Sequence, residues 1–287
     1  MLAVFLKEFR SYFTSAIGYI FIGTFLLITG IFFTMYNLLS SSPAYNGTLQ
    51  SLIIIFLFII PILTMKIMSE ETKNKTDQLL FTSPLKISDI VLGKYFAALA
   101  IFTISLLITV LYPLILSKFG TVSVSEIFTG YIGIFLLGAT LISLGLFVSS
   151  LTENQVTSAV ISFSVLLFIF LMDNIQRALP STRNSSIIFV LIVVVIFTLF
   201  VYFSTKNLIA ALITLVVGLI LTVSVYLLKK EAFDGLLQKV FDWFSLIKRY
   251  NLFSQGVLSL NSAVYYLSFI AAFVFLTIRM VDKRRWS

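Results

Sequence analysis

Residues 208–228 have the sequence LIAALITLVVGLILTVSVYLL, a run of 21 residues without one charged side chain. The hydrocarbon core of a bilayer is about 30 Å thick, and a helix that rises about 1.5 Å per residue needs about 20 apolar residues to cross it. A run of this length and composition therefore predicts a transmembrane helix.

Seven further apolar runs of this kind occur along the chain, and none carries a charge within its apolar body. Hydrophobic residues make up 59% of the 287 residues and charged residues only 11%, whereas soluble domains carry about 25% charged residues. We therefore predict an all-α, polytopic transmembrane bundle of about eight spans, with residues 1–287 forming a single transmembrane domain. The seven runs are Ile17–Leu39, Ser51–Met68, Phe96–Leu116, Ile127–Val148, Val156–Met172, Ile187–Phe203 and Ala263–Ile278.

The first run predicts a retained span, because it is too long for a signal peptide and lacks a small-residue cleavage site. Lysine and arginine favour the cytoplasmic side of a membrane protein. With the N-terminus inside, twelve of them lie in inner segments and eight in outer ones, five of the eight within residues 229–262. This distribution predicts that both termini are cytoplasmic.

The composition also excludes several kinds of chemistry. The chain has no cysteine and no histidine, which removes thiolate metal sites and the commonest general base. Its net charge of +8 is explained more simply by basic loops beside anionic lipid than by nucleic acid. Gly93-Lys94 resembles the end of a phosphate-binding loop, but Ser88 replaces its first glycine and Tyr95 follows the lysine. We therefore expect no catalytic residue, no metal and no cofactor on this chain.

Two segments outside the spans have amphipathic patterns. Residues 1–15 place apolar and charged side chains on opposite faces of a helix, which predicts an interfacial helix in the membrane plane; the alternative is a frayed extension of the first span. Residues 229–262 contain an apolar periodicity from Phe233 to Ile247, which predicts an outer interfacial or partly re-entrant helix. The runs before this segment predict a tight helical hairpin over residues 187–228.

The longest inner loop, residues 66–95, is the most charged part of the chain. It carries a short apolar patch, Leu79-Leu80-Phe81, and Pro84 should end a helix at about Ser83. The pattern predicts a short helix parallel to the membrane that offers an apolar knob to the cytoplasm. A solvated connector is the equal alternative from these residues alone.

Four local motifs give the chain a resemblance to a known family, the permease subunits of type-2 ABC transporters. The motifs are similar to the corresponding segments of the branch that includes gliding-motility and copper-site-maturation permeases. The motifs are the opening Lys7–Phe13 with Ile17–Ile20, the loop Glu70–Thr72 with Thr76–Pro84 and Asp89–Lys94, the turn Ser149–Gln155, and the tail Phe275–Thr277 with Lys283–Trp286. The family usually has six spans, so the hairpin at 187–228 resembles an insertion of two.

The resemblance implies that the loop docks as a coupling helix on a separate ABC ATPase subunit, which would hold ATP and Mg. It also implies a cell-membrane exporter with two permease subunits, as two copies or with a paralogue, two ATPases and possible auxiliary subunits. The implied ATPase-coupling residues are Glu70, Glu71, Thr76, Asp77, Leu79, Leu80, Phe81, Thr82, Ser83 and Pro84. The implied secondary cytoplasmic contact is Thr152, Glu153, Asn154 and Gln155.

Two rival functions would each require polar residues in or beside the spans. An autonomous secondary carrier or channel is disfavoured because the spans lack the ionisable residues that proton coupling needs. A membrane-embedded lipid-modifying enzyme would need polar residues that converge at one interface, and the sequence offers none. The 30 phenylalanines fit a lipidic cargo, but ordinary lipid-facing side chains are the simpler interpretation.

Overall fold

The computed structural model describes residues 1–76 and 85–285, and every regular element within them is helical. Eight helical stretches in this part of the chain are long and apolar enough to cross a membrane. The predicted all-helical class and number of spans are therefore confirmed. The chain divides into two compact units, Met1–Phe170 with Leu246–Ser287 (unit 1) and Leu171–Ser245 (unit 2).

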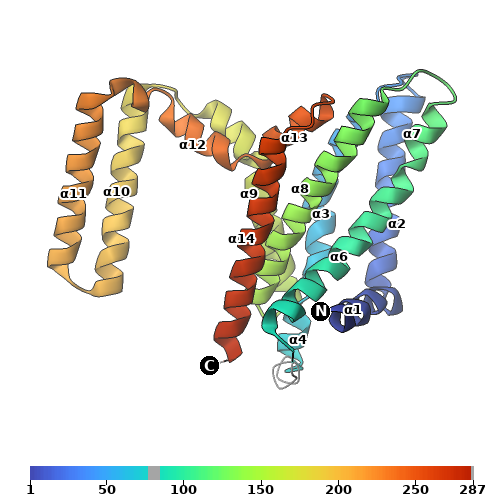
Figure 1. Cartoon of the computed structure of the whole chain (residues 1–287), viewed down its shortest axis with the longest axis horizontal. Helices are drawn as coiled ribbons and strands as arrows, with labels where there is room; N and C mark the ends of the chain where they lie inside the picture. Colours follow the sequence, from blue (N-terminus) through green and yellow to red (C-terminus); the bar gives the residue numbers. More distant parts are fainter. Residues whose placement is uncertain (77–84, 286–287) are drawn as a thin grey trace. The chain divides into compact units, whose positions relative to one another are not determined.

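Unit 1 contains most of the spans and both ends of the chain (Figure 1). A π-helical turn, η1 (Thr34–Leu38), extends its first span, and α9 continues beyond Phe170 into unit 2. Its α-helices are α1 (Leu2–Thr14), α2 (Ala16–Phe33), α3 (Asn46–Thr64), α4 (Ser69–Lys73), α6 (Ile87–Thr109), α7 (Leu111–Leu116), α8 (Val124–Leu151), α9 (Gln155–Ala178), α13 (Leu246–Ser254) and α14 (Leu260–Arg285).

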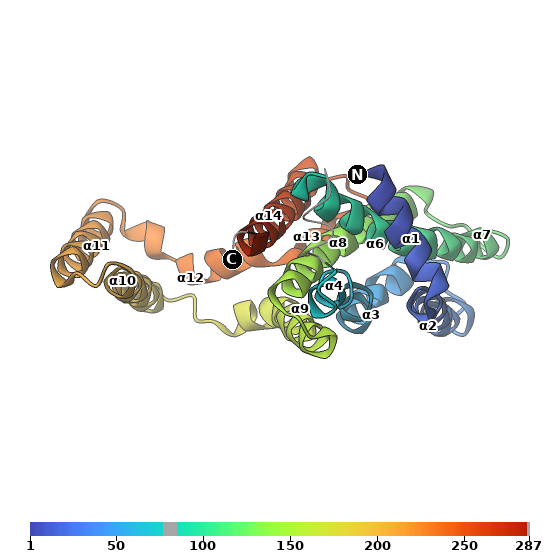
Figure 2. The same cartoon turned by 90° about the horizontal axis from the view of Figure 1, so that it is seen from below.

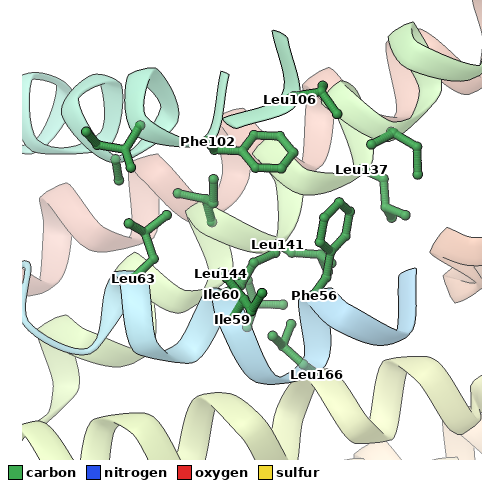
Figure 3. Packing of buried hydrophobic residues seen from close by; sticks show 14 of the residues in the cluster. Phe56, Ile59, Ile60, Leu63, Phe102, Leu106, Leu137, Leu141, Leu144 and Leu166 are labelled. Carbon is green, nitrogen blue, oxygen red and sulfur yellow. The ribbon is translucent and has the colours of Figure 1, made fainter. Parts of the chain in front are cut away.

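The core of unit 1 lies around α3 and α8, the two most deeply buried spans. Phe56 and Ile60 of α3 face Phe102 of α6 and Leu141 of α8 in this core (Figure 3). The glycines of α8 allow this close packing, because a Cβ on Gly138 would lie only 2.4 Å from the Phe102 ring. Because lipid is as apolar as these side chains, the packing of the helices depends on how closely their surfaces fit together.

Pro113 determines where the third span breaks. A proline cannot donate to the carbonyl four residues earlier, and its ring clashes with that carbonyl. The carbonyl in question belongs to Thr109, where α6 ends two residues before α7 begins. The Tyr45 hydroxyl donates to the Thr109 oxygen at 3.5 Å. Pro61, in contrast, lies within α3 one turn before its end, where it leaves α3 continuous.

The N-terminal helix α1 is distinct from the first span. Ser15 has extended backbone (φ −99°, ψ 158°), which separates α1 from α2. α1 packs against α2 and α6, and it crosses α6 near Gly93, in the first turns of that helix (Figure 2). Val4 and Tyr12 are its buried side chains. α1 is therefore not a straight extension of α2.

Unit 2 consists of a helical pair and two short helices. α10 (Arg183–Thr205) and α11 (Leu208–Leu228) run antiparallel over the residues for which the sequence predicts a hairpin (Figure 1). The turn between them depends on Lys206, which has a left-handed backbone (φ 50°), and on Asn207, whose side chain accepts from the Ile209 N–H at 2.9 Å. The short helices are η2 (Lys230–Phe233) and α12 (Leu236–Phe244).

The structure divides the single helix that the sequence predicts between Phe233 and Ile247. Gly235 adopts a left-handed conformation (φ 66°) before α12, and Ser245 is extended after it. Within unit 1, α13 is buried against α8, where Phe253 lies so close to Gly133 that any Cβ there would overlap it. The predicted outer segment is thus divided between α12, in unit 2, and α13, which belongs to the packed core of unit 1.

Candidate coupling site

Several polar segments meet at one end of unit 1. We call this region the charged end: α1, α4, the start of α6, and the last turns of α8 and α14, with both chain termini nearby (Figure 1). It contains the described part of the predicted coupling loop. Contacts described below join all five elements.

The structure places only three of the predicted coupling residues. Glu70 and Glu71 lie in α4, and Thr76 follows it in an exposed turn where its N–H donates to the Glu71 carbonyl at 3.0 Å. Glu70 forms an ion pair with Lys66 one turn earlier, at 3.2 Å. The other seven lie outside the described residues: Asp77, Leu79, Leu80, Phe81, Thr82, Ser83 and Pro84.

The end of α8 holds the start of α4. The Ser149 hydroxyl accepts from the N–H groups of Met68 and Ser69, at 3.1 and 3.2 Å, and donates to the Met65 carbonyl. The first N–H groups of a helix lack partners within the helix, so Ser149 satisfies two donors at this helix end. The sequence motif that resembles the family turn therefore begins with a residue that contacts the loop directly.

The predicted secondary contact lies just beyond Ser149. Glu153 and Asn154 are exposed, and the Asn154 side chain caps α9 by accepting from the Val156 N–H at 2.9 Å. Thr152 and Gln155 are half-buried, and the buried Thr152 hydroxyl has no hydrogen-bond partner. The structure therefore brings this turn to the same end of unit 1 as α4, with two side chains open to a partner.

Lys94, the last residue of the family-like motif Asp89–Lys94, is the most buried charge at this end. Its side chain is 1% exposed, and its Nζ lies 3.1 Å from Glu8 Oε1, 3.0 Å from Glu71 Oε1 and 2.8 Å from the Ile67 carbonyl. An ammonium group has three donors, and all three have acceptors here. Lys94 thus joins α6 to both α1 and α4.

Lys7 adds a second, exposed cation to these carboxylates. Its Nζ lies 3.3 Å from Glu71 Oε1 and 3.4 Å from Glu8 Oε1. Partial burial lowers the pKa of Lys7, but the attraction of Glu71 and Glu8 outweighs this effect and raises the pKa above its ordinary value. Two lysines and two glutamates therefore form a charge-balanced cluster, Lys7–Glu8–Glu71–Lys94.

The last helix also reaches the charged end, because Arg284 of α14 donates to the Thr72 hydroxyl of α4 at 3.0 Å. α4 is thus held by α8, α6 and α14, whereas its last residue, Lys73, and the turn that follows it to Thr76 are exposed. Among the described residues, no three Asp or Glu side chains gather into a set that could hold a metal ion.

The match to known proteins agrees with this geometry. Residues 2–186, more than half of the chain, match the family described as "ABC-2 family transporter protein". No curated protein matches the chain. The matched region includes α1, α4, α6 and α8, which build most of the charged end. With eight helices able to span a membrane, the chain belongs to the ABC-2 transporter family, as a multi-pass membrane permease that associates with an ABC ATPase.

Proposed function

We propose that this chain is the permease of an ATP-driven exporter in the cell membrane, with both termini in the cytoplasm. A separate ATPase would hold ATP and Mg and dock on the loop that begins with α4. Two permeases and two ATPases would form the working unit. The resemblance to the gliding-motility and copper-site-maturation branch, and an auxiliary subunit, belong to the same proposal.

The observation that carries the proposal is how α4 is attached to the rest of the permease. It is fixed to the body of the permease through Ser149 and Lys94, whereas its last residue, Lys73, and the turn that follows it to Thr76 are exposed. A short helix that is fixed to the permease and continues into an exposed turn can transmit a push from a docked protein without losing its own structure. Exposed charges around a docking site set the register of such an interface more than its strength.

The proposal is tested by co-expression with the ATPase of a neighbouring reading frame. The permease should co-purify with that ATPase, and Leu80→Asp should reduce recovery of the complex or uncouple ATP hydrolysis from transport. Leu80 lies outside the described residues, and its role rests on the sequence motif. Phe119→Asp is the matched control, because Phe119 is 80% exposed in the loop after α7, away from the charged end.

The outcomes separate the proposal from its rival. Full assembly and coupled transport in the Leu80→Asp variant would remove the docking assignment. Transport by the permease alone, without any ATPase, would instead favour an autonomous carrier or channel. Equal loss in the Leu80→Asp and Phe119→Asp variants would show general damage, and would also count against docking at Leu80.

A further inference from the structure

We propose that Lys94 is a positioning residue that makes the interfacial helix α1 move with the ATPase-binding segment α4. This inference rests on the proposed function, because it needs α4 to be displaced by a docked ATPase. In the docking proposal Lys94 only holds α4 in place, and its second ion pair, to Glu8 of α1, has no role there.

Gly93 brings α1 and α6 together. A Cβ built on Gly93 would lie 2.9 Å from Val4 Cβ and 3.1 Å from the Met1 carbonyl, closer than ordinary van der Waals contact. Any side chain at this position would push α1 away from α6. The glycine therefore sets the separation at which the next residue, Lys94, can reach Glu8 of α1.

Lys94 then joins three elements through one atom. Glu8 and Glu71, which are 16% and 14% exposed, reach its Nζ from α1 and α4. Lys7 of α1 contacts the same two carboxylates. Every ion pair that the structure describes between α1 and α4 therefore includes Glu71, and Lys94 lies at the centre of this cluster.

Burial makes this link stiff. The attraction between buried charges compensates for their lost hydration only while the geometry is good, and withdrawing one partner leaves an uncompensated buried charge. A small separation of α4 from α1 is thus more unfavourable than loss of the Lys66–Glu70 ion pair, whose side chains are 26% and 37% exposed. The consequence is that α1 and α4 should shift as one body when the loop is displaced.

The natural absence of cysteine permits a direct test with paired spin labels. Arg10→Cys places one label on the exposed face of α1, and Phe119→Cys places the other in the loop after α7. In nanodiscs that contain the complete permease–ATPase complex, pulsed electron paramagnetic resonance measures their distance with and without Mg-ATP and vanadate. We expect a nucleotide-dependent shift in the unmodified permease background.

Lys94→Met keeps most of the side-chain length and removes the charge, so it should abolish this shift while the ATPase still co-purifies. Lys66→Met is the matched control, since it removes the less buried ion pair that Lys66 forms with Glu70 of α4, and it should preserve the shift. Glu8→Gln is the milder variant for the case in which Lys94→Met does not fold, and the shift should also be lost. Loss of ATP-stimulated transport should accompany loss of the shift.

Two results would overturn the inference: a nucleotide-dependent shift that persists in the variant that folds, or no shift of α1 in the unmodified background. Failure of the ATPase to bind the unmodified chain is a different result, because it removes the docking proposal together with everything that depends on it. A fall in thermal stability with the shift retained would show that Lys94 only stabilises the fold.

Discussion

Replacing Gly138 with alanine tests whether the core of unit 1 depends on a glycine contact. The added Cβ would lie 2.4 Å from Phe102 Cζ, whereas ordinary contacts begin at 3.4 Å, so the ring has to move by about 1 Å. Phe102 is fully buried, and the rings of Phe25, Phe56 and Phe135 surround it at centroid distances of 6.3, 5.5 and 6.5 Å. The ring therefore cannot move without disturbing its neighbours.

The magnitude follows from two opposing terms. Overpacking a well-filled core costs about 1–3 kcal/mol, while alanine in place of glycine favours a helix by about 1 kcal/mol. Gly23→Ala isolates the second term, because no atom lies within 4 Å of a Cβ at this position of α2. We expect the free energy of unfolding of Gly138→Ala to be lower than that of Gly23→Ala by about 1–3 kcal/mol.

The assay is reversible unfolding by SDS titration in mixed micelles, with Phe102→Leu as the second arm of a double-mutant cycle. Leucine removes the ring atoms that the new methyl group would meet, so the double variant should be more stable than the sum of the single effects by about 1 kcal/mol. Equal stability of Gly138→Ala and Gly23→Ala, or strictly additive effects of Gly138→Ala and Phe102→Leu, would refute this account of the core.

Two further predictions concern polar contacts. The Tyr12 hydroxyl donates to the carbonyl of Leu63, in the last turn of α3, at 3.1 Å. Tyr12→Phe should therefore destabilise the fold by about 1–2 kcal/mol. An unchanged midpoint in the same SDS titration would contradict this prediction. In unit 2, two hydrogen bonds from Arg183 lower the pKa of Asp234 below its ordinary value of 3.8. These bonds therefore stabilise the folded state above pH 3.8, and this stabilisation is lost as the pH falls through the lower pKa of the folded state. The carboxyl NMR shift of Asp234 checks this, because Arg183→Gln should return the titration midpoint to the ordinary range, and an unmoved midpoint would exclude Arg183 as the cause.

Span positions could be predicted from the sequence because they depend on a single local quantity. About 20 consecutive apolar residues fit the bilayer whatever their neighbours are, so residues 208–228 identify α11 without any tertiary information. Breaks between helices were harder to predict. The missing hydrogen bond of Pro113 to the Thr109 carbonyl explains the break between α6 and α7, but Ser245, between α12 and α13, carries no comparable signal. The division between α12 and α13 follows from the packing of α13 against α8, which sequence periodicity does not contain.

The role of Lys94 could not be predicted for a related reason. A lysine at the edge of an apolar run usually extends its ammonium group to the water at the interface. Lys94 has the same local sequence as such a lysine, but it is buried because Glu8, 86 residues away along the chain, lies on a helix that Gly93 allows to approach. A glycine directly before a lysine at the start of a span is the one signal that could have indicated it. Its similarity to a phosphate-binding loop directed attention to the wrong chemistry.

The contact between Arg284 and Thr72 restricts how the chain can depart from a six-span permease. These residues lie 212 positions apart, yet their side chains are 3.0 Å from each other, so the end of α14 must return to the side of the membrane on which α4 lies. An even number of crossings must therefore separate them. The number of crossings is even for the spans α6, α8, α9 and α14. It stays even only if α10 and α11 are both counted or both left out. A single helix in place of the α10–α11 pair would leave an odd number of crossings and would separate Arg284 from Thr72.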